Sequence, residues 1–196
     1  MDESFQRLYE KYHQDIFQFL YYLVKDREQA EDLVHEVYIK VLKSYSSFEG
    51  RSSEKTWLFS IARHVAIDFF RKQKTLRQRI MEKFDLDQAQ IADREPLPEE
   101  IALQREEIQM LYKAMNDCNV NQRTVLILRF IKELSVAETA EVLGWTESKV
   151  KTTQHRALKV LKNYIDKAMK EQGVTKDQGA MTEQEVVSSE KLSVER

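Results

Sequence analysis

The segment from Leu134 to Leu161 constrains the fold more than any other part of the chain. Ser135 is followed three residues later by Glu138, a capping-box pattern that begins a helix. Gly144 can adopt the left-handed conformation that ends this helix, and Thr146 can cap a second one. The apolar residues of the second helix recur at helical spacing: Val150, Ala157, Leu161 and Ile165. The segment therefore predicts two helices joined by a tight turn, a helix-turn-helix.

The outer face of that second helix is polar and basic. It carries Ser148, Lys149, Lys151, Thr152, His155, Arg156 and Lys159. Such a face suits insertion into the major groove of DNA. The alternative interpretation is an amphipathic helix pair whose charged face meets only water.

Composition favours an all-α fold, because helix formers dominate and the 196 residues include only 4 Gly and 2 Pro. The net charge is only −2, so any affinity for nucleic acid must come from locally segregated charge. A single cysteine, Cys118, cannot form an internal disulfide, which fits a reducing compartment. The sequence shows neither a signal-peptide pattern nor a membrane-length apolar run. We therefore expect a cytoplasmic protein without membrane insertion.

The N-terminal part predicts three helices. The first spans about 4–24, and the second begins after a capping Asp26 and continues to about Lys43. Glu28, Glu31, Asp32, His35 and Glu36 give the second helix an acidic outer face, which could be merely solvated or could dock a partner. A loop over 44–53 then leads to a third helix that starts at Ser52 or Ser53.

The third helix combines basic and aromatic residues. The bases between residues 63 and 79 are Arg63, Arg71, Lys72, Lys74, Arg77 and Arg79, opposed only by Asp68. The interleaved rings are Trp57, Phe59, His64 and Phe70. This combination suits exposed nucleic-acid bases, which stack on aromatic side chains. Equally open is a helix whose aromatic residues are core and whose cations reach out to water.

The chain changes character after about residue 80. Residues 81–100 are acidic, contain both prolines, and are interpreted as a flexible linker between domains 1–80 and 101–170. In the second domain one helix follows Ile101, and another is expected to be capped by Asn121 and to run through Ile131. Residues 171–196 lack a strong apolar period and are interpreted as a disordered tail.

Nothing in the sequence predicts an enzyme. The four histidines do not pair with cysteines or carboxylates at metal-ligand spacing, and neither a Gly-rich phosphate loop nor a nucleophile elbow is present. We therefore assign no catalytic, cofactor-binding or metal-binding residues.

Two groups of motifs together resemble a known family. They are E-D-L-V-H-E-V-Y-I-K (31–40) with T-W-L-F-S-I-A-R-H-V-A-I-D-F-F-R (56–71), and Q-R-T-V-L-I-L-R-F (122–130) with the helix-turn-helix. In this order they resemble the extracytoplasmic-function, or group four, RNA polymerase sigma factors, and most closely the sigma-X type of bacilli. The resemblance covers roughly residues 5–168.

The resemblance implies a role for each domain. Residues 1–80 would bind core RNA polymerase and open the downstream (−10) promoter element, and residues 101–170 would read the upstream (−35) element. The partners implied are promoter DNA, the clamp helices and flap of core polymerase, and an anti-sigma factor.

The resemblance also implies three sets of contact residues. The polymerase-binding set is Asp32, His35 and Glu36, with His35 where the family usually has Gln. The downstream-element set is Phe48, Gly50, Arg51, Ser52, Lys55, Trp57, Arg63 and His64, with His64 where Asn is frequent. The upstream-element set is Ser148, Lys149, Lys151, Thr152, His155 and Arg156.

Two other functions are compatible with parts of the sequence. A free-standing helix-turn-helix regulator accounts for the C-terminal domain but leaves the basic-aromatic helix and the acidic face unexplained. A recombinase requires a nucleophilic Ser or Tyr, whereas Tyr21, Tyr22 and Tyr38 all fit helical patterns.

Overall fold

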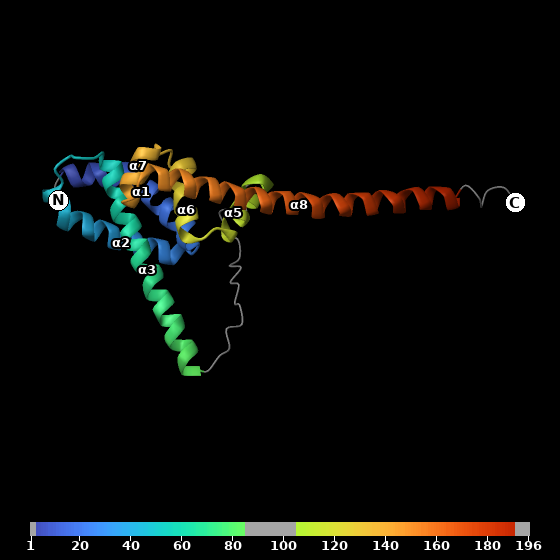
Figure 1. Ribbon diagram of the computed structural model, residues 1–196, viewed down its shortest axis with the longest axis horizontal. Coiled ribbons are helices and arrows are strands. Elements are labelled where there is room, and N and C mark those ends of the chain that lie inside the picture. The colour runs from blue at the N-terminus through green and yellow to red at the C-terminus, as the bar shows by residue number, and fades with distance from the viewer. Residues whose placement is uncertain (1–2, 85–104, 191–196) are drawn as a thin grey trace.

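The computed structural model describes the backbone of residues 3–84 and 105–190, and side chains within 3–76, 105–106 and 108–170. These residues form helices and short connections, without any strand, as the composition predicts. Two helices leave the compact part of the molecule, α3 at its C-terminal end and α8 toward the C-terminus (Figure 1).

The N-terminal bundle follows the predicted pattern closely. Helix α1 (Glu3–Val24) buries the stripe that includes Leu8, Ile16 and Phe19. Helix α2 (Arg27–Ser44) is capped by Asp26, whose carboxylate accepts a hydrogen bond from the Gln29 amide at 2.7 Å. A 3-10 turn, η1 (Tyr45–Ser47), leads to Phe48.

Helix α3 (Glu54–Phe84) begins where predicted, because the Ser53 hydroxyl accepts a hydrogen bond from the Thr56 amide at 3.0 Å. It packs against both α1 and α2. The helix reaches Phe84, so the first four residues assigned to the linker are helical. The rest of the predicted linker, 85–100, lies outside the described residues.

The second half consists of α5 (Glu106–Ala114), η2 (Met115–Asp117), α6 (Val120–Leu126), the π-helical turn η3 (Ile127–Ile131), α7 (Val136–Leu143) and α8 (Glu147–Glu190). The prediction that Asn121 caps one helix through Ile131 is wrong. Asn119 caps α6 instead, in a reciprocal box with Gln122, whose amide donates to Asn119 at 3.0 Å.

The C-terminal segment continues the last helix. Helix α8 extends to Glu190 and so includes residues 171–190, and the interpretation of 171–196 as a disordered tail stays a prediction. Gly173 and Gly179 each cost about 1 kcal/mol of helix stability but do not block a helix, and proline is absent there.

The buried apolar residues of both halves form one continuous core. Helix α7 packs on α3, and α6 and η3 approach α1. The guanidinium of Arg123, which is 9% exposed, donates to the carbonyl of Leu23 at 3.0 Å. The two halves are therefore docked against each other.

Candidate nucleic-acid interface

The helix-turn-helix is built as its sequence predicts. The Ser135 hydroxyl accepts from the Glu138 amide at 3.1 Å, and the Glu138 carboxylate accepts from the Ser135 amide at 2.7 Å. Hydrogen bonding of the Glu138 carboxylate to the Ser135 hydroxyl and to the Ser135 amide lowers the pKa of Glu138. Gly144 ends α7 with φ 61°, and the Thr146 hydroxyl accepts from the Lys149 amide at 3.3 Å.

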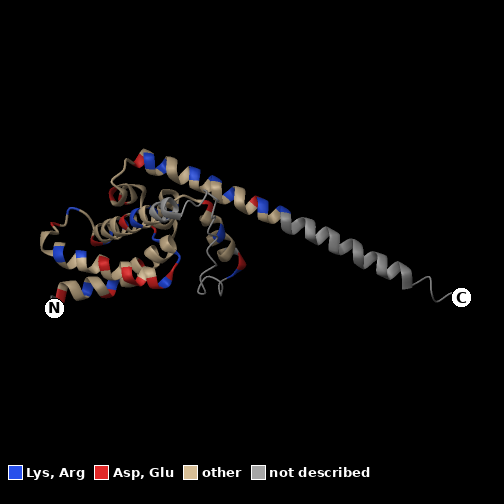
Figure 2. Cartoon of the chain, turned by 90° about the horizontal axis from the view of Figure 1, so that it is seen from below, with Lys and Arg blue, Asp and Glu red and all other residues tan. Residues whose placement is uncertain are grey.

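The predicted upstream-element residues share one exposed face of α8. Val150 and Ala157 are fully buried and orient the helix, with Leu161 nearly so. Gln154 holds it to η3 by accepting a hydrogen bond from Arg129 at 3.1 Å. All six predicted contact residues are exposed: Ser148, Lys149, Lys151, Thr152, His155 and Arg156. Lys and Arg positions recur along this helix (Figure 2).

Two lysines of this face already have local partners. The Lys149 ammonium lies 4.1 Å from the centroid of the Trp145 ring, and Lys151 lies 3.5 Å from Glu147. Both contacts are at the surface, where ion pairs contribute about 0–1 kcal/mol. Because these contacts are weak, the two ammonium groups can be redirected to phosphates at little cost.

The loop before α3 forms an open, aromatic cavity. It has a volume of about 320 Å³ and is lined by Ser47, Phe48, Glu49, Arg51, Ser52 and Trp57. The Phe48 and Trp57 rings lie 4.7 Å apart between centroids. Gly50 turns the loop with φ 68°, in the left-handed region that favours glycine. Five predicted downstream-element residues thus meet in one place: Phe48, Gly50, Arg51, Ser52 and Trp57.

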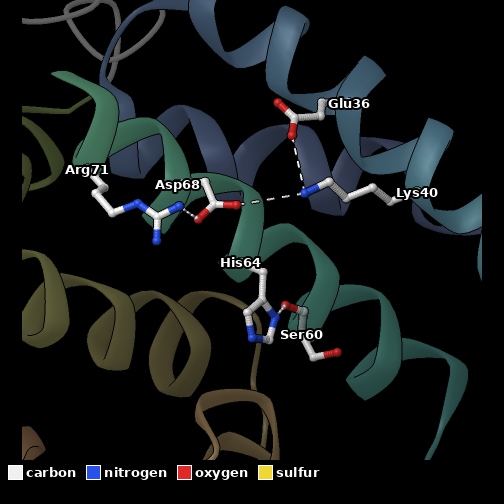
Figure 3. Close-up of polar contacts among 6 residues, drawn as sticks. All are labelled: Glu36, Lys40, Ser60, His64, Asp68 and Arg71. Carbon is white, nitrogen blue, oxygen red and sulfur yellow. Dashed lines mark hydrogen bonds and ion pairs between the residues drawn. The ribbon is translucent and has the colours of Figure 1, made fainter. Parts of the chain in front are cut away.

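The remaining downstream-element residues lie along α3. His64 is exposed, and its Nδ1 donates to the Ser60 carbonyl at 2.6 Å, which leaves Nε2 facing outward (Figure 3). Arg63 is half-buried, which lowers the pKa of its guanidinium. Lys55 is directed elsewhere, because its ammonium donates to the Lys132 carbonyl at 2.8 Å.

The prediction that four rings of α3 offer stacking surfaces is wrong for one of them. Phe59 is fully buried and meets Phe19 edge-on, with centroids 5.3 Å apart. Trp57 and Phe70 are half-buried. Phe59 fits the apolar stripe of the helix as well as the aromatic set, so the sequence alone could not separate the two interpretations.

The acidic face of α2 is accessible and connected to α3. Asp32 and His35 are exposed, and Glu36 pairs with Lys40 at 3.3 Å. Lys40 also lies 3.9 Å from Asp68, which pairs with Arg71 at 3.1 Å (Figure 3). This chain of charges links the exposed edges of the two helices, whose packing rests on the buried core.

Sequence reasoning missed two residues on this face. Ile39 and Leu42 are 51% and 55% exposed and continue the stripe of His35 by helical spacing. The signal was present in the sequence, because both fall outside the α2 core positions Val34, Val37 and Val41.

A larger groove lies between α1, α2 and α5. Its volume is about 640 Å³, and its lining includes Tyr9, His13, Phe17, His35 and Ile108. Nδ1 of His13 is buried and lacks a hydrogen-bond partner within the described part of the chain. Burial, with the nearby charge of His35, lowers the pKa of His13.

Comparison with known proteins identifies the two halves. Residues 8–75 match the family model of sigma-70 region 2, and residues 108–161 match that of sigma-70 region 4. The chain is 59% identical over 166 residues to the ECF RNA polymerase sigma factor SigX of Bacillus subtilis, covering 85% of this chain and 86% of that protein. The chain belongs to the extracytoplasmic-function sigma factors.

Two further matches agree. RNA polymerase sigma factor YlaC of B. subtilis is 34% identical over 88% of this sigma factor and 98% of its own length. The sigma factor RpoE of Bartonella quintana, solved with the anti-sigma factor NepR, shares the fold with a TM-score of 0.64 at 24% identity, over 84% of this chain and 98% of that one.

Family membership decides between the alternatives left open by the sequence. A sigma factor is a DNA-binding initiation subunit that associates with core RNA polymerase and directs it to promoters, and a free-standing regulator is excluded. Among the described residues, no helix is both long and apolar enough to cross a membrane, and no cluster of potential metal ligands is found.

Proposed function

We propose that this sigma factor divides promoter recognition between α8, which reads the upstream element, and the Trp57 cavity, which captures a base of the downstream element. The supporting observation is that all six candidate residues of α8 lie exposed on one face behind a buried apolar stripe. That arrangement suits major-groove readout by the second helix of a helix-turn-helix. Lys149 and Arg156 contact phosphates in this proposal, while Lys151, Thr152 and His155 reach base edges.

The downstream role rests on the cavity that Phe48 and Trp57 line. A base removed from its stack needs a surface that replaces the lost stacking, and two adjacent rings supply one. Arg51 and Ser52 add donors at the cavity, and Arg63 and the outward Nε2 of His64 extend the polar track along α3. Lys55 joins them in this proposal once its hydrogen bond to the Lys132 carbonyl is released. Domains 1–80 and 101–170 then act on separate promoter elements, joined by the linker 81–100.

The acidic face of α2 is the proposed docking site for the clamp helices of core polymerase. Asp32, His35 and Glu36 supply the polar contacts, and the exposed Ile39 and Leu42 supply apolar area next to them. Binding energy at an interface is concentrated in a small apolar centre from which water is excluded.

In this proposal the sigma factor performs no covalent chemistry, works in the cytoplasm, and is restrained by an anti-sigma factor. The aromatic groove beside α2 supports the last point, because a partner seated there would cover His35. The similar RpoE of B. quintana was solved with an anti-sigma factor.

Two double substitutions test the division of labour. Lys151→Ala with His155→Ala should weaken holoenzyme binding to the upstream element at least tenfold, since each base contact contributes about 1–3 kcal/mol. It should leave association with core polymerase unchanged. Asp32→Ala with Glu36→Ala should show the reverse. Equal loss of both activities in both variants would contradict the assignment.

A further inference from the structure

We propose that the free sigma factor is held closed by a polar lock centred on Lys132, and that this lock must open before α3 can engage DNA. The inference rests on the proposed function, because it concerns access to the downstream-element residues. The lock consists of Lys132, Asp15, Gln18 and Lys55.

Lys132 joins the two halves of the molecule. Its ammonium donates to Asp15 at 2.8 Å and to Gln18 at 2.6 Å, and both partners lie on α1. The residue is 4% exposed, although it belongs to the segment between η3 and α7. A buried ammonium is costly unless it is paired, so this charge fixes where the second half docks.

Lys132 also binds Lys55, one of the candidate DNA-contacting residues. Its carbonyl accepts the Lys55 ammonium at 2.8 Å, and the charge of Lys55 also contributes to the lowered pKa of Glu138 on α7. This hydrogen bond uses one of the three ammonium donors of Lys55 and holds the half-buried side chain against the second half of the molecule. Helix α7 additionally packs on α3.

The contact is suited to reversible opening. A buried ion pair gains little net stability, because the attraction only offsets the loss of hydration, and opening returns both charges to water. Asp15 is already 40% exposed in the closed state. The apolar part of the junction includes the tilted ring pair of Tyr22 and Tyr112, 6.0 Å apart. Directional polar contacts thus select the closed geometry.

Distance measurements on the full-length protein test the lock directly. Spin labels at Lys43→Cys on α2 and Lys162→Cys on α8 report on the separation of the halves, and the native Cys118 is buried at 3% exposure. The free protein should give one short-distance population. Lys132→Met and Asp15→Asn should each move at least half of the molecules to longer distances, whereas the exposed Lys167→Met should not.

If circular dichroism shows that Lys132→Met does not fold, the distances measured in Asp15→Asn decide the test. Unchanged distances in Asp15→Asn, or a free protein that is already open, would overturn the lock. Core polymerase should lengthen the distances in the wild type and bind Asp15→Asn about fivefold more tightly. Failure of core polymerase to bind any form would instead overturn the proposed function and leave the lock intact.

Discussion

At the scale of single residues, Trp57 is the most informative position for function. It lines the cavity, in contact with the ring of Phe48 and beside Tyr45, and is half-buried. Trp57→Ala should weaken holoenzyme binding to a promoter fragment opened at the downstream element by about 5- to 150-fold, the equivalent of 1–3 kcal/mol of base stacking. Fluorescence anisotropy of the labelled fragment measures this change.

Trp57→Phe serves as the matched control, since it keeps a ring at the same site and should retain most of the affinity. If Trp57→Phe and Trp57→Ala lose affinity equally, the cavity does not act by stacking. Affinity for the upstream element alone should be the same in both variants.

Arg123 is the residue whose structural role was hardest to foresee. Its guanidinium donates to the carbonyls of Leu23, Met115 and Cys118, at 3.0–3.3 Å. Arg123→Met should lower the free energy of unfolding by about 3 kcal/mol, because buried carbonyls lose charged donors. Urea denaturation measures the loss, and the exposed Lys167→Met should leave the midpoint unchanged. A midpoint shift no larger than that of the control would refute the role.

At the scale of elements, the capping box of α7 makes a pH-dependent prediction. Hydrogen bonds from Ser135 lower the pKa of Glu138 below 4.5, so the carboxylate stabilises the folded state above that pH. The contribution is lost as the pH falls through the lowered pKa. Glu138→Gln should therefore be less stable than wild type near pH 7, and the difference should shrink below pH 4.5. A difference that is constant with pH would contradict this account.

Local chemistry explains which elements could be predicted. The caps at Asp26, Ser135 and Thr146 follow from side chains that accept hydrogen bonds from amides at the start of the helix, and the structure confirms them. The cap of α6 was misplaced, because Asn119 and Asn121 are both acceptable caps. Only Asn119 is followed three residues later by a glutamine, Gln122, and that pattern decides the choice. The π-helical turn η3 has no comparable sequence signal.

At the scale of the whole molecule, the docking of the two halves could not be predicted. Lys132 reaches partners 114 and 117 residues away, and the Lys55 contact spans 77 residues. Helical periodicity shows which face of each helix is buried but not which helix covers it. The grouping of the candidate residues of α8, and of those in the Trp57 loop, followed from the sequence because each set lies within one element or one loop, and their contacts with DNA stay a prediction.

Separation of the two halves on binding is the prediction that belongs to this scale. Distances between α2 and α8 should lengthen when core polymerase and promoter DNA bind the full-length protein, since the two domains then contact separate promoter elements. Distances within the N-terminal bundle, between labels on α1 and α2, should stay constant. Unchanged distances between α2 and α8 in the bound state would argue against any rearrangement.

The central claim is that this chain directs core RNA polymerase to promoters. Transcription in a purified system tests it most directly, using core enzyme and genomic fragments with and without the protein. We predict discrete transcripts only when the protein is present, whose start sites share one upstream and one downstream element. An absence of transcripts, together with tight binding of duplex DNA by the protein alone, would contradict the account.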